Sequence, residues 1–291
     1  MIWQSSVKMN KRSYAVPFPF LHAVSLLSHK RRIEKFRTVI HQVVDNGSVV
    51  VDLGCGSGVL GMLAAKAGAK KVTCVDINPE AIEYARRTAR KNNLEDRMDF
   101  IAGDFRDMML GDRADVVICE MLSSFMLVEQ QIPASVHARK HLLKSDGILL
   151  PSRVRIYLVP VECEGVWSRF SQSGIEFEPV PQTVEKGMAR DLADLALVSE
   201  LTFNTENEPK TIDESLDFNV CSDGNLHGFV GMFEADLGQK IKLRMEDGWR
   251  ELFMPIESPL CVKEGQTLRV HVRFTPGEYD TLRLHVQLSA Q

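Results

Sequence analysis

The sequence lacks the features that mark several classes of protein. Its six cysteines include no C-x-x-C pair, so neither a zinc ribbon nor a disulfide scaffold is indicated. No stretch reaches the ~20 consecutive apolar residues of a membrane-spanning helix. The apolar run at 14–27 contains Pro17, Pro19 and His22 and has no signal-peptide cleavage site. We therefore expect reduced thiols, no membrane partner and a cytoplasmic location.

An excess of basic charge is also missing, since the formal net charge is −4 at pH 7. Non-specific nucleic-acid binding depends on clustered Lys and Arg, so a nucleic-acid partner is not expected. The charge is divided unevenly: residues 1–150 hold 21 basic and 16 acidic side chains, and residues 151–291 hold 14 and 23. Solvated loops account for most of these carboxylates, but the acidic half also suits a cationic partner.

What the sequence does contain is an alternation of short β-branched runs with helical-period segments between residues 48 and 161. This alternation predicts a parallel sheet wrapped by helices. One helix is expected to begin at Pro79 and end at Asn92. The predicted strands are Ser48–Leu53, Lys71–Ile77, Met98–Ala102, Ala114–Cys119 and Gly147–Leu150 continuing into Val154–Val161.

After Pro151 the pattern changes to runs that alternate apolar and polar residues, as antiparallel strands do. We expect an N-terminal helical segment over 1–47, an α/β domain over 48–151 and a β-rich domain over 152–291. Residues 171–217 carry many prolines and acidic residues and are expected to form an excursion or a flexible arm. The runs that predict antiparallel strands are Leu226–Ala235, Leu268–Phe274 and Leu282–Leu288.

The strongest local signal is a glycine-rich turn, residues 49–58, in which a buried strand runs into Gly54, Gly56 and Gly58 before a helix. Glycine is needed where a ligand approaches the backbone closely or where φ is positive. Two cofactor classes fit, because Asp76 follows Gly56 by 20 residues as a dinucleotide fold would require. The position of Gly54 directly after the strand decides against that class.

Residues 51–58, Val-Asp-Leu-Gly-Cys-Gly-Ser-Gly, resemble the first motif of class I S-adenosylmethionine (SAM) methyltransferases. The resemblance implies a Rossmann-like, doubly wound SAM-binding domain, followed here by a β-barrel-like antiparallel domain. It also implies that an acidic residue ending the second strand accepts hydrogen bonds from the ribose hydroxyls, and that one after the third strand reads the adenine. The implied cofactor-binding residues are Asp52, Gly54, Gly56, Gly58, Asp76 and Asp104.

The segment after the fourth predicted strand carries Glu120 and Glu129, nine residues apart. It resembles the double-Glu loop of protein arginine N-methyltransferases, as do residues 60–71 and 144–151. In that family the two glutamates are catalytic, and an arginine that matches Arg37 binds the SAM carboxylate. A guanidinium presents donors along two edges, which two carboxylates can hold. Methyl transfer from a sulfonium is an in-line displacement that needs no metal.

The sequence also departs from that family. The Thr-His-Trp motif of its β domain corresponds to Asp247-Gly248-Trp249, without the histidine, and Met121 stands where Trp is usual. Trp249 is thus a substrate-binding candidate. The acceptor stays open between protein arginine and a small cationic molecule such as an amine, and a SAM-binding module without catalysis is a third hypothesis. The resemblance implies a homodimer, for which residues 171–200 are the candidate arm.

Overall fold

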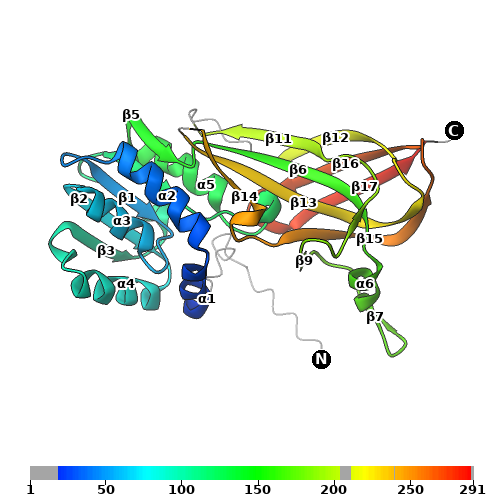
Figure 1. The fold of residues 1–291 in the computed structure, drawn as a ribbon, viewed down its shortest axis with the longest axis horizontal. Helices are drawn as coiled ribbons and strands as arrows, with labels where there is room; N and C mark the ends of the chain where they lie inside the picture. Colours follow the sequence, from blue (N-terminus) through cyan, green and yellow to red (C-terminus); the bar gives the residue numbers. More distant parts are fainter. Residues whose placement is uncertain (1–18, 204–210, 239, 290–291) are drawn as a thin grey trace, which may run out of the picture.

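The computed structural model describes residues 19–203, 211–238 and 240–289. An α/β part and an elongated β part lie side by side, with the N-terminal helices at their junction (Figure 1). Pro151, after a cis peptide bond, stands between the last strand of the first sheet and the first strand of the second. Among the described residues, no helix is both long enough and apolar enough to cross a membrane.

The first sheet has five parallel strands in the order β3-β2-β1-β4-β5. Helix α3 (Val59–Ala67) packs on β1 and β2, and α5 (Gln131–His137) packs on β4. The predicted parallel sheet wrapped by helices is confirmed. Its strands agree with the predicted ones except that β5 begins earlier and does not continue into residues 154–161, which belong to a strand of the second sheet beyond Pro151. Their bounds are β1 Val49–Leu53, β2 Lys71–Asp76, β3 Met98–Ala102, β4 Ala114–Cys119 and β5 Leu143–Leu150.

Helix α4 (Pro79–Lys91) begins where the sequence predicted, and its first residues show why. The Asn78 side chain accepts a hydrogen bond from the Glu80 backbone N–H at 2.9 Å, and Pro79 occupies the first helical position, where its missing N–H costs nothing. The inner face is apolar and buried, at Ala81, Ile82, Ala85 and Ala89.

The second part consists of antiparallel sheets, as predicted. The 15-residue strand β13 (Gly224–Gly238) is central and pairs with β6, β14 and β15. A second sheet has the order β12-β16-β17. Several strands were not predicted, among them β11 and β12 inside the acidic segment. The bounds are β6 Arg153–Glu162, β9 Gln182–Val184, β10 Arg190–Asp191, β11 Ala196–Thr202, β12 Ile212–Asn219, β14 Ile241–Arg244, β15 Glu251–Val262, β16 Thr267–Thr275 and β17 Glu278–Leu288.

The candidate arm is shorter than expected. Within residues 171–200, β9 pairs with β15, while β10 and β11 pair with β6, so most of the segment belongs to the main β sheet. The projecting part is α6 (Glu164–Trp167) with the hairpin of β7 (Ser171–Gln172) and β8 (Ile175–Glu176) (Figure 1). Strands β9 and β10 are only three and two residues long, too short to show an apolar alternation. The sequence therefore did not reveal that this segment joins the main β sheet.

Helices α1 (Phe20–Ser25) and α2 (Lys30–Val43) precede the first strand. Helix α2 contacts α3 on one side and β14 of the second part on the other. The Lys35 Nζ donates to the Lys242 carbonyl at 2.7 Å and to Asp247 Oδ2 at 2.6 Å. The predicted N-terminal helical segment thus ties the two parts together; its residues 1–18 lie outside the described residues.

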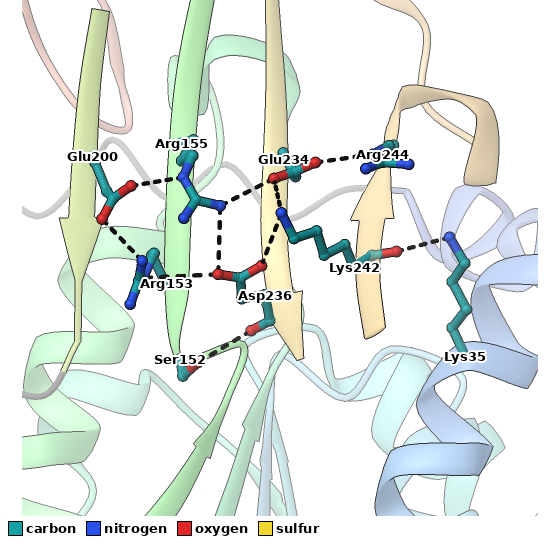
Figure 2. A network of polar contacts seen from close by, with 9 residues as sticks. All are labelled: Lys35, Ser152, Arg153, Arg155, Glu200, Glu234, Asp236, Lys242 and Arg244. Atoms are coloured by element: carbon teal, nitrogen blue, oxygen red, sulfur yellow. Dashed lines mark hydrogen bonds and ion pairs between the residues drawn. The ribbon is translucent and has the colours of Figure 1, made fainter. Parts of the chain in front are cut away.

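The strands beside this contact carry a row of alternating charges (Figure 2). Arg155 on β6 pairs with Glu200 at 2.6 Å and with Glu234 at 3.0 Å, and Lys242 pairs with Glu234 at 2.7 Å. Cross-strand pairs of opposite charge stabilise a sheet modestly and fix its register. Lys242, whose carbonyl accepts a hydrogen bond from Lys35, therefore belongs to a row of four cations and three carboxylates. Its other members are Arg153, Asp236 and Arg244.

Candidate active site

The glycine turn has the backbone that the sequence implied. Gly54, Gly56 and Gly58 have φ of +67°, +51° and +77°, a region that side-chain-bearing residues rarely adopt. A Cβ at Gly54 would lie 2.8 Å from the Met121 side chain, and one at Gly58 would lie 2.8 Å from Ala85. Both strain and space therefore require glycine here.

Two predicted carboxylates support this turn. Asp76 Oδ2 accepts from the Gly56 N–H at 2.8 Å, and burial raises the pKa of Asp76 despite this bond and a second one from Asn78. Asp52 Oδ2 accepts from the Gly61 N–H at 2.8 Å, below the turn. Asp52 is buried, and that burial raises its pKa to about 7. Asp76 is thus brought to the turn, whereas Asp52 fixes the helix that follows.

Asp104 lies at the end of β3 and caps a 3-10 turn. Its Oδ1 accepts from the Arg106 N–H at 2.9 Å, and its carboxylate forms an ion pair with the Arg106 guanidinium at 2.5 Å. The side chain therefore has local partners in this structure. Its assignment to adenine remains a prediction.

The loop between β4 and α5 brings Glu120 and Glu129 to the same region. Phe125 and Met126 have φ of +62° and +54°, an uncommon conformation for side chains of this size. Two polar residues hold the loop: Ser123 Oγ accepts from the Glu129 N–H at 3.0 Å, and the buried Gln131 accepts from the Met121 N–H at 2.9 Å. No motif in the sequence pointed to either residue.

An arginine from α2 is bound at the first glutamate. Arg32 forms an ion pair with Glu120, both side chains being largely buried, and its guanidinium lies 4.6 Å from the centre of the Trp249 ring. Burial lowers the pKa of Arg32 to about 10, an effect that the charge of Glu129 opposes. Arg37 instead lies exposed on the same helix and pairs with Glu34. The arginine that the structure brings to the site is thus Arg32.

Trp249 joins the two parts of the molecule at this point. Its Nε1 donates to the Leu122 carbonyl in the double-Glu loop at 2.7 Å, and its ring packs edge-on against Phe233, with centroids 5.1 Å apart. The Ser124 hydroxyl of the same loop donates to the Arg250 carbonyl. The predicted substrate-binding residue is therefore placed next to Arg32 and to the double-Glu loop.

Glu129 differs from Glu120 in its electrostatic state. Burial raises the pKa of Glu129 to about 7, and the positive charge of Arg32 partly offsets that shift. Within the part of the chain that the structure describes, Glu129 has no ion-pair partner within 4.0 Å. The site thus holds one carboxylate neutralised by a cation and one whose proton is exchangeable near neutral pH, which suits proton transfer.

Comparison with known proteins identifies the family of the chain. A family model described as a methyltransferase domain matches residues 44–191. The chain belongs to the methyltransferase domain family. This methyltransferase membership, with the residues above, decides for the SAM-type glycine turn over the dinucleotide alternative.

The methyltransferase is similar to arginine methyltransferases in sequence. It is 33% identical over 155 residues to protein arginine N-methyltransferase PRMT10 of Oryza sativa subsp. japonica, covering 52% of this chain and 40% of that protein. It is 28% identical over 272 residues to an arginine N(omega)-methyltransferase of Streptomyces achromogenes subsp. streptozoticus, covering 85% and 74%. The resemblance read from the double-Glu loop is confirmed, although the chain spans only two fifths of the rice relative.

Its fold matches solved structures of that family as well. The protein arginine methyltransferase 10 structure from Arabidopsis thaliana has a TM-score of 0.76 and 21% identity, covering 92% of this chain and 93% of that one. The Trypanosoma brucei PRMT1 enzyme-prozyme structure with AdoHcy has a TM-score of 0.74 and 21% identity, covering 92% and 96%. The predicted combination of a Rossmann-like domain with a barrel-like domain is confirmed.

Proposed function

We propose that the chain is a SAM-dependent N-methyltransferase whose acceptor is the guanidinium of a protein arginine. One observation carries the proposal: the double-Glu loop already binds a guanidinium, that of Arg32, between Glu120 and the Trp249 ring. A site that holds one guanidinium by a carboxylate and an aromatic face has the chemistry to hold another.

The residues at the turn fit SAM. The glycines leave the backbone open to a ligand, and Asp76 stands at the turn with a carboxylate that can receive the ribose hydroxyls. Arg32, and not Arg37, is the cation proposed for the carboxylate of SAM, because it is the one that reaches the site. Asp104 remains the proposed adenine contact. When bound, SAM supplies an electrophilic methyl group on its sulfonium.

Glu120 and Glu129 would hold the acceptor and receive its proton. The reacting nitrogen forms a bond to the methyl carbon as the carbon–sulfur bond breaks, and the methylated nitrogen then loses one proton. Glu129, with its pKa raised to about 7, can take that proton at neutral pH. Correct alignment of the nucleophile, the methyl carbon and the sulfur can lower the activation barrier by ~7–11 kcal/mol.

A second acceptor class is favoured by a specific observation. The Streptomyces relative, which aligns with 85% of this chain, is described as an arginine methyltransferase without reference to protein. A free guanidine-bearing amino acid is therefore the alternative acceptor, with the same residues in the same roles.

One experiment separates these hypotheses. The purified chain is incubated with methyl-labelled SAM and either free arginine or a dialysed cell extract, and the products are identified by mass spectrometry. Label on protein arginine supports the first proposal, and label on free arginine alone supports the second. SAM binding without transfer to either would leave a SAM-binding module. Glu120→Gln and Glu129→Gln should abolish transfer while SAM still binds.

We further propose a homodimer in the cytoplasm. The projecting hairpin exposes Ile175 and Phe177, which are 58% and 53% accessible and stand away from the core. Exposed apolar groups of this kind suit an interface.

The proposed cytoplasmic location is supported by the cysteines. All six are free thiols, as a reducing compartment maintains them. A separate experiment tests the dimer. If Phe177→Ser leaves the molecular mass measured by light scattering at that of the native dimer, the hairpin is not the interface.

A further inference from the structure

Three consecutive residues of the second part contact one face of helix α2. Lys35 Nζ donates to Asp247, and Arg32 stacks on Trp249. His29, at the N-cap of the helix, lies against Gly248. His29, Arg32 and Lys35 are spaced by three residues, so they lie along one side of the helix. Each residue of the Asp247-Gly248-Trp249 loop therefore contacts a different residue on that side of α2.

The His29 ring occupies the space that a side chain at position 248 would fill. A Cβ at Gly248 would lie 2.4 Å from His29 Nδ1 and 2.6 Å from Cγ, and the φ of Gly248 is +134°. Both the conformation and the space therefore disfavour any other residue there unless the His29 ring moves. Position 248 is also where the related motif carries its histidine. In this chain the imidazole of His29 reaches the same place from the start of helix α2.

Two buried polar atoms at this contact make no hydrogen bond. Within the described part of the chain, His29 Nδ1 and Asp247 Oδ1 are the buried side-chain polar atoms that make no hydrogen bond. The second oxygen of Asp247, Oδ2, is fully used, by Lys35 Nζ at 2.6 Å and the Arg244 N–H at 2.9 Å. Buried polar atoms are rarely left unpaired in a working state. One of these two can be a donor and the other is an acceptor.

We propose that His29 is a positioning residue of the methyltransferase, replacing from α2 the histidine absent from the loop. In the ligand-loaded site its Nδ1–H donates to Asp247 Oδ1, which fixes the loop on α2 and holds Trp249 beside the double-Glu loop. This role rests on the proposed function, because Trp249, whose position it fixes, lies at the site proposed for methyl transfer.

The charges around His29 favour its neutral form. Burial lowers the pKa of His29, and the neighbouring charges of Arg32 and His22 lower it further. Arg31, whose Nε is 3.9 Å from Asp247 Oδ1, and Lys35 add positive charge on the helix side, and Asp247 is the anion on the loop side. A neutral imidazole protonated on Nδ1 can donate to Asp247 without placing another cation beside Arg32.

The kinetic test uses three variants. His29→Phe keeps a ring of similar size but has no nitrogen, and His29→Asn keeps an amide nitrogen close to the Nδ1 position. His41→Ala, an exposed histidine on the same helix, is the matched control. We expect His29→Phe to lower kcat roughly 10- to 100-fold, since a displacement of ~1 Å can cost that much. His29→Asn should recover most of it, and His41→Ala should match the unchanged chain. Equal kcat for His29→Phe and the unchanged chain overturns the proposal.

A spectroscopic test does not depend on activity. Long-range proton–nitrogen NMR of the imidazoles reports which ring nitrogen carries the proton, and the signal lost in His29→Asn assigns His29. With S-adenosylhomocysteine and arginine added, we expect the Nδ1-protonated neutral tautomer and a proton slow to exchange. The Nε2-protonated tautomer in that sample overturns the proposal. If the unchanged chain transfers no methyl group, the proposed function fails, while the NMR result still decides the role of His29.

Discussion

Arg32 of helix α2 and Glu120 of the double-Glu loop form a largely buried ion pair that joins the N-terminal segment to the loop after β4. The pair is covered on one side by the Trp249 ring. Taking both charges out of water is costly, and their mutual attraction repays that cost only where the geometry is good and further hydrogen bonds are made.

Removal of Arg32 should destabilise the chain strongly. Arg32→Met leaves the Glu120 carboxylate buried without its cation, and breaking such a pair costs about 3–5 kcal/mol. Urea unfolding measures the loss, and calorimetry should show much weaker SAM binding by the folded variant. Arg37→Met is the control, because Arg37 pairs with Glu34 on the exposed face, and it should change neither quantity. Equal SAM affinity in Arg32→Met would remove Arg32 from the cofactor site.

Asp52 should make the folded state less stable as the pH rises toward neutrality. Its pKa is about 7 in the folded chain against an ordinary value of 3.8, so between these pH values the folded state keeps a proton that the unfolded state has lost. The free energy of unfolding therefore falls from about pH 4 to pH 7 and is level above it.

The comparison variant is Asp52→Asn, which cannot titrate. Its free energy of unfolding, measured by urea at several pH values, should fall less steeply over that window, by a few kcal/mol in total. Glu129, with a raised pKa of its own, keeps part of the slope in both proteins. Parallel curves for the two proteins would mean that Asp52 titrates normally.

Methyl transfer should require the ionised form of Glu129. Because the pKa of Glu129 is raised to about 7, kcat should increase with pH and reach half of its maximum near pH 7. Steady-state rates between pH 5.5 and 8.5 test this. A rate that is flat across that range would assign proton acceptance to another group, such as solvent.

Trp249→Phe should weaken acceptor binding more than folding. The variant keeps a ring over Arg32 but loses the hydrogen bond from Nε1 to the Leu122 carbonyl, worth about 1 kcal/mol. We expect KM for the acceptor to rise about 5- to 10-fold. Trp167→Phe removes a comparable bond, to the Ile256 carbonyl at 3.0 Å, away from the site. If both variants alter KM equally, Trp249 has no special part in the acceptor site.

Asp76→Asn should weaken SAM binding while leaving the turn folded. The amide can still accept one backbone hydrogen bond but loses the charge that strengthens bonds from hydroxyl donors, a difference of about 1–2 kcal/mol or roughly 10-fold in Kd. Asp99→Asn, on the neighbouring strand β3, is the control, since Asp99 pairs with Lys71 at the surface. An unchanged Kd for Asp76→Asn would remove this carboxylate from the cofactor site.

Local signals in the sequence predicted the α/β sheet and the glycine turn well. Strands β1 and β4 are mostly apolar and buried, and Pro79 and Asn78 mark a helix start by themselves. The resemblance to SAM methyltransferases also implied a place for Asp76 at the end of the second strand, and there its carboxylate accepts the Gly56 N–H.

What the sequence did not reveal depends on contacts between distant segments. Arg32 and Arg37 lie on the same helix, and the choice between them is made by the side of α2 that faces the loop from the second part. Ser123 and Gln131 hold the double-Glu loop through backbone bonds that no residue pattern specifies. The missing histidine of the loop could not be matched with His29, which is more than 200 positions earlier.

The contact of α2 with both sheets has a consequence for how the chain can be divided. A cut at Pro151 separates two sets of strands, yet it would leave Lys35 without its acceptors at Lys242 and Asp247 and Arg32 without the Trp249 ring. The first half, expressed alone, would expose a cationic helix face and hold Arg32, the arginine proposed to bind SAM, poorly. The boundary visible in the sequence therefore separates two architectures but not two independent folding units.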